Sequence, residues 1–272
     1  MHRTIEVTTE GAILNAQLTA NASASGLPLV FLHAGVADLR MWQAQCEGFA
    51  DRHPVLAYDR RGFGASRITA AVPHARVADL WAVMDAAGLK RAVLVGCSQG
   101  GRVALDAALE QPQRVAGLVL VAPAVTGAPD AELSGAVKVL GDAIDAASAA
   151  GDLARVNELE AQLWLDGPDS APGRVSGAVR ELFLAMNQIA LHAPDPGPVV
   201  DAPSAWTRIE QVEAPALLVW GDLDLPHLRS RCELLATRLP QVQRVVMEGT
   251  AHLPGLESPA RFNALLRDWL SA

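Results

Sequence analysis

The sequence has few aromatic residues and no long basic cluster. Only 4% of its 272 residues are aromatic and 19% are charged. Thirty aspartates and glutamates outnumber 22 lysines and arginines, which gives a formal net charge of −8, and no basic run is longer than the pair Arg60-Arg61. Proteins that bind a phosphate backbone carry clustered lysine and arginine, so nucleic acid is not an expected partner.

Cysteine is also scarce. Cys46, Cys97 and Cys232 are too few and too far apart for a disulfide framework, and no C-x-x-C pair suggests a zinc site. Such cysteine usage fits a reducing compartment. We therefore expect neither disulfides nor a metal centre.

Long apolar runs and targeting signals are missing as well. The longest apolar runs, 118–125 and 214–220, contain prolines and fall well short of the ~18 residues of a membrane span. The first residues lead directly into alternating sequence, without the apolar stretch of a secretory signal. We expect a soluble, cytoplasmic protein with no membrane partner.

Aliphatic residues, in contrast, are abundant. Half of the chain is hydrophobic (50%), which is enough apolar surface to exclude intrinsic disorder. Short runs rich in Val, Leu and Ile alternate with stretches of helical periodicity, and this pattern is typical of a mostly parallel sheet flanked by helices. The expected α/β fold has eight strands, at 4–9, 12–20, 29–33, 55–59, 92–97, 115–122, 216–221 and 242–248. Helices are expected at 41–52, 76–87, 99–111, 228–239 and 260–270.

One interval is too long for this alternation. Pro123 and Pro215 are separated by 92 positions, whereas a crossover helix with its loops needs only about a dozen residues. Helical periodicity at 131–150, 153–164 and 174–192, followed by a proline-rich return at 193–203, fills the interval. The economical interpretation is a helical cap at 127–205, inserted into one core that comprises 1–126 and 206–272.

The clearest chemical motif is Gly96-Cys97-Ser98-Gln99-Gly100, which follows an apolar strand and opens a predicted helix. A G-x-S-x-G sequence in this setting is typical of a nucleophile elbow, which lifts the serine hydroxyl to a helix N-terminus. A phosphate-binding loop is the alternative, but the segment lacks the G-K-[ST] of a P-loop and the spacing of a dinucleotide fingerprint. Ser98 is therefore the candidate nucleophile.

A nucleophilic serine needs a base and an acid that orients the base. Histidine is the usual base near neutral pH. Of the seven histidines, His252 follows the predicted strand 242–248 and so lies at the carboxyl edge of the sheet, where active sites of open α/β sheets gather. Asp222 and Asp224 both follow the strand 216–221, and on chemistry alone either one is a candidate for the orienting carboxylate.

Five segments, in order, make the chain similar to α/β-hydrolase-fold enzymes with a helical cap, over nearly its whole length. They are Leu32-His33-Ala34-Gly35 with Trp42, the run Tyr58-Asp59-Arg60-Arg61-Gly62-Phe63-Gly64-Ala65-Ser66, the elbow, Gly221-Asp222-Leu223-Asp224, and Ala251-His252-Leu253-Pro254 with Glu257 and Pro259. The resemblance implies a triad of Ser98, Asp224 and His252, because the acid of the family's G-x-x-D pattern falls on Asp224.

The resemblance also implies an oxyanion hole formed by the backbone N–H groups of Gly35 and Gln99. The residue before Gly35 is alanine where the family often has glycine, which leaves Val36 as an alternative donor. His33 is expected to brace this loop by a hydrogen bond. For the run after residue 58, the resemblance favours a structural role over anion binding.

Cys97 stands where the family more often has histidine. Nothing in the sequence supplies the positive setting that a reactive thiolate needs, so Cys97 is not expected to be the nucleophile.

The expected activity is hydrolysis of a carboxylic ester or lactone of a small to medium, mostly apolar substrate, with no metal or organic cofactor implied. Ser98 at the elbow argues against epoxide hydrolases and haloalkane dehalogenases, which need aspartate there. Carbon–carbon hydrolases and cofactor-free perhydrolases use the same triad and stay open. A ligand-binding sensor on a hydrolase scaffold is the alternative from another class, since a fold does not determine a function.

Overall fold

The computed structural model describes residues 2–21 and 24–272, and within them the chain forms one mixed sheet of nine strands. Met1 and the pair 22–23 belong to the predicted core segment but lie outside the described residues. The strands are β1 (His2–Thr9), β2 (Ala12–Thr19), β3 (Leu29–Leu32), β4 (Val55–Tyr58), β5 (Arg67–Ile68), β6 (Ala92–Cys97), β7 (Val115–Val121), β8 (Ala216–Gly221) and β9 (Val242–Met247).

The order of strands in the sheet is β1-β2-β4-β3-β6-β7-β8-β9, with the short β5 paired to β2. The hairpin strands β1 and β2 are antiparallel to each other, and β2 is antiparallel to β4. All pairings from β4 through β3 to β9 are parallel. The carboxyl ends of β6, β8 and β9 therefore meet at one edge of the sheet.

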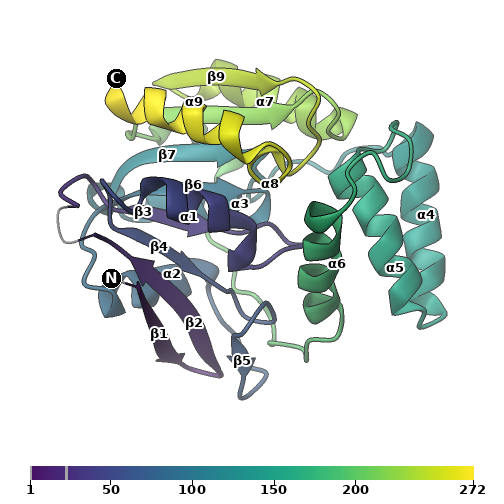
Figure 1. Ribbon diagram of the computed structural model, residues 1–272, viewed down its shortest axis with the longest axis horizontal. Helices are drawn as coiled ribbons and strands as arrows, with labels where there is room; N and C mark the ends of the chain where they lie inside the picture. The colour runs from purple at the N-terminus through teal and green to yellow at the C-terminus, as the bar shows by residue number, and fades with distance from the viewer. Residues whose placement is uncertain (1, 22–23) are drawn as a thin grey trace.

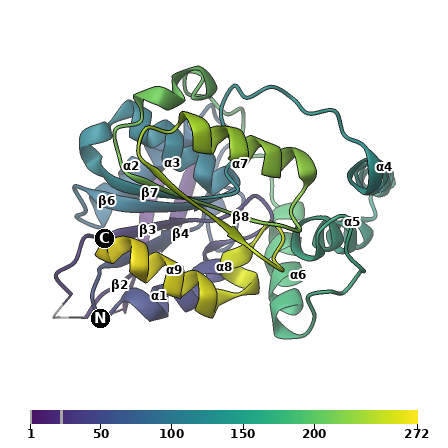
Figure 2. The same ribbon diagram turned by 90° about the horizontal axis from the view of Figure 1, so that it is seen from above.

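Helices cover both faces of the sheet (Figures 1 and 2). α2 (Arg76–Ala86), α3 (Gln99–Glu110) and α7 (Pro226–Arg238) lie on one face. α1 (Gln43–Phe49), α8 (Pro254–Glu257) and α9 (Pro259–Ser271) lie on the other. Short 3₁₀ helices occur at η1 (Leu39–Trp42), η2 (Pro112–Arg114) and η4 (Trp206–Gln211).

The central strands are buried on both faces, which is why they read as continuous apolar runs rather than as alternating ones. In β3, Val30 and Leu32 pack under α2 and α3, whereas Leu29 and Phe31 pack under α1 and α9. All four of these side chains have 0% exposure. The apolar cores on the two faces of the sheet therefore hold the carboxyl ends of the central strands in place.

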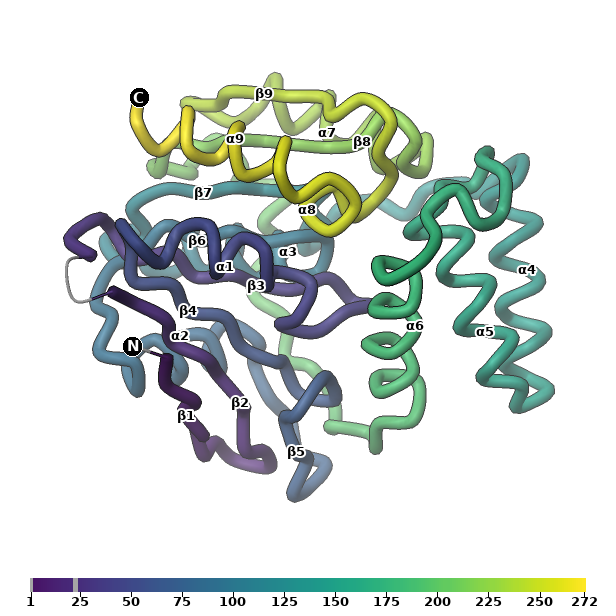
Figure 3. The backbone as a smooth tube through the Cα atoms, in the orientation of Figure 1, coloured from purple at the N-terminus to yellow at the C-terminus, as the bar shows by residue number. Residues whose placement is uncertain are grey.

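Between β7 and β8 the backbone leaves the sheet, forms a helical layer and comes back (Figure 3). This layer contains α4 (Gly135–Ala149), α5 (Leu153–Glu160), the π-helical turn η3 (Ala161–Asp166) and α6 (Ala178–Leu191). α4 and α5 share a small apolar cluster with Leu225 and Leu228 of the core, while Phe183 and Met186 of α6 belong to the core cluster under α1 and α9. We call residues 127–205 the cap; their limits as a domain stay a prediction.

The fold class is as expected, an α/β fold with a mostly parallel sheet flanked by helices. The sheet has one strand more than the eight expected, because the two-residue β5 is too short to leave an apolar pattern. The helix expected from Arg174 begins at Ala178, after Gly177 with a left-handed φ of 63°. No helix formed by the described residues is long and apolar enough to cross a membrane.

Candidate active site

Ser98 stands at the sharp turn between β6 and α3, with φ 53° and ψ −114°. A non-glycine residue with a positive φ is strained, and strained residues are frequent at functional sites. The flanking glycines allow the turn: a Cβ on Gly96 would lie 2.4 Å from the Gly100 carbonyl oxygen, and a Cβ on Gly100 would lie 2.1 Å from the Leu32 carbonyl oxygen. The motif therefore has the local geometry of a nucleophile elbow.

Asp224 and His252 form a buried pair at the same edge of the sheet. Asp224 follows β8, His252 follows β9, and each is 1% exposed. His252 Nδ1 lies 2.9 Å from Asp224 Oδ2 and 3.1 Å from Oδ1, and Oδ1 also accepts the Leu225 N–H at 2.7 Å. A carboxylate on Nδ1 keeps the proton there and leaves Nε2 as the acceptor.

His252 Nε2 is buried and has no hydrogen-bond partner among the described residues. Its loop nevertheless contacts the elbow, because Cys97 Sγ donates to the His252 carbonyl oxygen at 3.5 Å. The elbow and the His252 loop are thus in contact, and no hydrogen bond joins Ser98 to His252 Nε2 among the described residues. Catalytic hydrogen bonds are often long in unliganded enzymes and tighten when substrate binds.

The two acids after β8 have different contacts. Asp222 Oδ1 accepts the Gly249 N–H at 2.6 Å, in an exposed position. Only Asp224 of the two is hydrogen-bonded to His252. The geometry therefore favours Asp224 as the residue that orients the imidazole.

The two predicted oxyanion donors lie next to each other. Gln99 is the first residue of α3, so its N–H has no acceptor within the helix. A Cβ on Gly35 would lie 2.7 Å from Gln99 Nε2, which places the Gly35 turn against the elbow. Gly35 and Val36 share that turn, so the choice between them as second donor stays a prediction.

His33 braces the turn, as expected. Its Nε2 accepts the Arg60 backbone N–H at 3.0 Å, and its Nδ1 lies 2.7 Å from the Ala34 carbonyl oxygen. Burial, reinforced by the Arg60 charge, holds the pKa of His33 well below its ordinary value. The imidazole is therefore neutral at neutral pH and serves as a structural link.

The expected structural role of the run after β4 holds for two of its charged residues. Asp59 accepts the N–H groups of Leu39 and Ala65, each at 2.9 Å. Arg61 forms a two-pronged ion pair with Asp79, at 2.7 and 2.9 Å. Both side chains therefore connect loops by hydrogen bonds at the carboxyl edge of the sheet.

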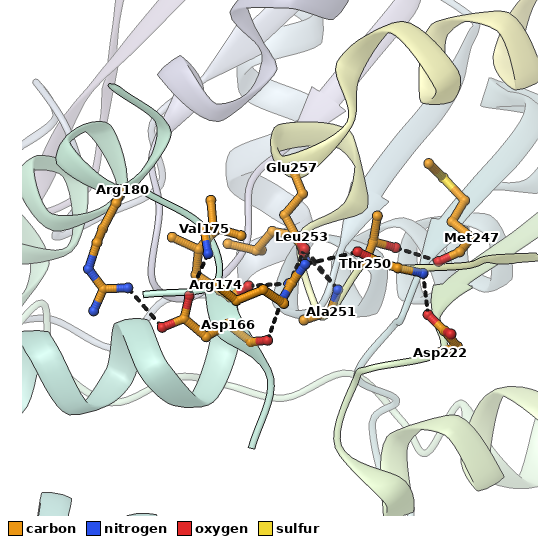
Figure 4. A network of polar contacts seen from close by, with 12 residues as sticks. Asp166, Arg174, Val175, Arg180, Asp222, Met247, Thr250, Ala251, Leu253 and Glu257 are labelled. Carbon is orange, nitrogen blue, oxygen red and sulfur yellow. Dashed lines mark hydrogen bonds and ion pairs between the residues drawn. The ribbon is translucent and has the colours of Figure 1, made fainter. Parts of the chain in front are cut away.

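Glu257 holds the loop that carries His252 (Figure 4). Its carboxylate accepts the Ala251 N–H at 2.9 and 3.0 Å and the Leu253 N–H at 3.1 Å, one residue on either side of His252. It also pairs with Arg174 of the cap, whose guanidinium donates to the carbonyl oxygens of Leu165 and Asp166. Burial raises the pKa of the Glu257 carboxyl, and the hydrogen bonds from Arg174, Ala251 and Leu253 oppose this.

Trp164 of the cap contacts His252 directly. The Trp164 carbonyl oxygen in η3 accepts the His252 N–H at 3.2 Å, and the two rings lie 4.8 Å apart between centroids. π-Helical turns are rare and frequently lie at functional sites. The cap therefore covers and helps to position the candidate base.

Sequence reasoning did not identify Arg174 as a site residue. It lies in a loop without a motif, and its partner Glu257 is 83 positions away, so no local pattern signals the pair. Glu257 itself belongs to the histidine segment that carried the family resemblance, but its role becomes visible only through its contacts.

Cys97 does not have the environment of a nucleophile. Its thiol is fully buried, and burial raises its pKa well above the ordinary value. This agrees with the expectation that Ser98 rather than Cys97 is the reactive group.

Comparison with known proteins agrees with this geometry. The sequence model of a family described as the alpha/beta hydrolase fold matches residues 28–259. The chain is 28% identical to a 2-hydroxymuconate semialdehyde hydrolase of Pseudomonas sp. (strain CF600), over 92% of this chain and 88% of that protein. A thermophilic esterase of Thermogutta terrifontis has a solved structure that superposes with a TM-score of 0.76 at 26% identity, covering 100% of this chain and 98% of the esterase.

A higher identity is confined to a shorter stretch. The chain is 39% identical over 102 residues to a protein named carbamate hydrolase RutD from Caulobacter sp. (strain K31). This match spans 36% of the chain and only 38% of that relative.

Proposed function

Because the chain belongs to the alpha/beta hydrolase fold family, we propose that it is a serine hydrolase that cleaves a carboxylic ester or lactone through an acyl-enzyme. The observation that carries the proposal is the buried Asp224–His252 pair, whose free Nε2 lies in a loop that contacts the Ser98 elbow. This is the arrangement that nucleophilic catalysis by a serine requires.

In the proposed reaction, Ser98 Oγ attacks the carbonyl carbon while His252 Nε2 accepts its proton. Asp224 keeps the tautomer and stabilises the imidazolium. The N–H groups of Gln99 and Gly35 donate to the oxyanion, and each such donor is worth roughly 2.7–4 kcal/mol in the transition state. His252 then gives the proton to the leaving group, activates water and releases the acid.

The substrate is proposed to be small to medium in size and mostly apolar. The cap side that meets the sheet carries Leu165, Phe183 and Met186, and Trp164 lies against His252. The full-length similarity to a thermophilic esterase favours ester cleavage.

Carbon–carbon bond hydrolysis is the second candidate. It is favoured by the 28% identity to a 2-hydroxymuconate semialdehyde hydrolase over 92% of the chain. Such an enzyme would use the same serine, acid and histidine, so the triad does not separate the two reactions.

The test is labelling with a fluorophosphonate probe together with turnover of p-nitrophenyl esters and of a lactone panel. Ser98→Ala should abolish both labelling and turnover. If the wild-type protein shows neither labelling nor turnover that depends on Ser98, the esterase proposal is wrong and a ligand-binding sensor becomes the better hypothesis.

A matched pair of variants tests the acid. Asp224→Asn should lower kcat by roughly 10⁴-fold, because the imidazole then loses its orienting carboxylate. Asp222→Asn should change kcat by less than about tenfold, since the Asp222 side chain accepts a hydrogen bond from the Gly249 N–H and is not hydrogen-bonded to His252. A larger loss in Asp222→Asn would refute the assignment.

A further inference from the structure

A cavity of about 220 Å³ lies beside the elbow, between the segment after β4, the start of α2 and the chain that comes back from the cap. Its lining includes Tyr58, Arg60, Arg61, His74, Arg76 and Gln99. Tyr58, Arg60, Arg61 and His74 are each at most 9% exposed, whereas Arg76 and Gln99 are partly exposed. The cavity thus has a buried polar floor and a more accessible rim.

The charges that line the cavity do not balance. Three arginines face a single carboxylate, that of Asp79, in a protein whose net charge is −8. Asp79 is neutralised by its two-pronged pair with Arg61. At the rim, Arg76 has Asp201 at 3.6 Å.

Arg60 is the arginine without a carboxylate partner among the described residues. Its guanidinium donates to neutral acceptors, the carbonyl oxygens of His33 and Ala34 and the Gln99 Oε1, and lies over the Phe63 ring. Burial lowers the pKa of Arg60 to about 10, so the group still carries its charge at neutral pH. A buried charge without a counter-ion is costly.

Two buried polar groups of residues that line this cavity have no hydrogen-bond partner among the described residues, Arg60 Nε and the Tyr58 hydroxyl. Leaving a buried polar group without a hydrogen bond destabilises the folded state, and such groups are rare in native proteins. Here both orphaned groups come from residues that line one cavity, next to the unpaired charge. This combination is unlike a surface arginine and points to a missing acceptor.

We propose that this cavity binds a small monocarboxylate. The carboxylate is held by the Arg60 guanidinium with Tyr58 beside it, so that its single negative charge neutralises the one guanidinium of the cavity that has no carboxylate partner among the described residues. A carboxylate is the planar, two-oxygen partner that a guanidinium matches best. The volume is below the roughly 300–1,000 Å³ of sites for drug-sized ligands, which restricts the ligand to a short chain.

The carboxylate site is distinct from the catalytic centre, although one residue joins them. Gln99 lines the cavity with its side chain, receives the Arg60 Nη1 donor at 2.9 Å and offers its backbone N–H to the proposed oxyanion hole. Binding does not require Ser98 chemistry, so Ser98→Ala should bind the ligand as the wild type does. Loss of the proposed hydrolase activity would therefore leave this proposal standing.

The test uses sodium propionate as the probe, with sodium chloride at equal ionic strength as the reference and inorganic phosphate as a second arm. The melting temperature of the wild type and of Ser98→Ala should rise with propionate in a saturable way, by roughly 3–5 °C at ten times Kd. Isothermal titration calorimetry should give one site per chain. A response to phosphate that exceeds the response to propionate would overturn the carboxylate assignment.

Tyr58→Phe removes one orphaned hydroxyl without breaking any bond among the described residues, so it should fold and weaken propionate binding about tenfold. Arg60→Gln should abolish binding. Arg238→Gln is the control, because Arg238 also stacks on an aromatic ring, Trp206, but pairs with Glu210 away from the cavity. The proposal is overturned if the wild type shows no saturable response, or if Tyr58→Phe binds propionate as tightly as the wild type.

Discussion

Replacing Glu257 by glutamine should displace His252, the proposed general base, although Glu257 binds only the backbone on either side of it. Glutamine has nearly the shape of glutamate but keeps only one side-chain oxygen as an acceptor. The Glu257 carboxylate now serves the N–H groups of Ala251 and Leu253 and the Arg174 guanidinium, and its side chain is 2% exposed. In the variant, the amide nitrogen must face one of these donors.

The magnitude follows from the bonds that are lost. A hydrogen bond to a charged group is worth ~1.5–3 kcal/mol, and removing one partner of a buried ion pair costs about 3–5 kcal/mol. Because Arg174 is 23% exposed and water can solvate it in part, we expect about 2–3 kcal/mol in the free energy of unfolding. Misplacing His252 by about 1 Å should lower kcat by 10- to 100-fold with little change in KM.

The assays are urea unfolding and steady-state hydrolysis of a p-nitrophenyl ester, both under conditions in which the variant is fully folded. Glu158→Gln is the matched control, since Glu158 pairs with Arg180 at 3.1 Å in the same cap but is 51% exposed; it should cost less than about 1 kcal/mol. Combining Glu257→Gln with Arg174→Met should give a loss smaller than the sum of the two single losses. Unchanged kcat in Glu257→Gln, together with stability equal to that of Glu158→Gln, would refute the positioning role.

Three further predictions concern stability and reactivity. Burial lowers the pKa of His33, so His33 takes up a proton in the unfolded chain before it does in the folded protein as the pH falls below about 6.5. The free energy of unfolding of the wild type should therefore fall faster than that of His33→Gln, by up to ~1.4 kcal/mol per pH unit. Urea unfolding from pH 8 to 5 measures both slopes. An equal slope in both proteins would contradict the assignment. Gly100→Ala should lower the free energy of unfolding by more than about 3 kcal/mol, because the new Cβ would lie 2.1 Å from the Leu32 carbonyl oxygen. In Gly141→Ala, in α4, the new Cβ would have nothing within 4 Å, so this variant should raise the free energy of unfolding by about 0.5–1 kcal/mol. Thermal unfolding compares the two, and similar effects would show that the elbow is not tightly packed. Burial raises the pKa of Cys97, of Cys232 and, to about 12, of Cys46, so iodoacetamide at pH 8 should label the buried Cys97 and Cys232 not at all and the half-buried Cys46 only slowly in the native protein. All three should be labelled in urea, as read by mass spectrometry, and rapid native labelling of Cys97 or Cys232 would contradict their burial.

The sequence predicted those features that short segments determine by themselves. The central strands, buried on both faces, leave continuous apolar runs, and β6 and β8 match the expected ranges 92–97 and 216–221. The elbow is likewise local, because its serine and glycines lie within five positions. The family resemblance then selected Asp224 over Asp222, and the hydrogen bond to His252 agrees with that choice.

The features that were missed depend on contacts between distant segments. The Arg174–Glu257 pair joins the cap to the histidine loop, and the Trp164 carbonyl reaches His252 across 88 positions. Neither Arg174 nor Trp164 belongs to a sequence motif that predicts its contact partner. The cavity that Arg60 lines was missed for a different reason. The segment after β4 matches a structural segment of the family, and only the folded structure shows that Arg61 has a carboxylate partner whereas Arg60 has an unpartnered Nε.

The parallel addition of β8 and β9 to the edge of β7 also sets an order of events during synthesis. Ser98 is synthesised before the residues that would activate it, Asp224 and His252, which follow the cap in the chain. Chains fold largely from the N-terminus as they emerge from the ribosome. A nascent chain that stops after the cap therefore has its elbow but not the proposed base, and the proposed triad is complete only once β8 and β9 have docked.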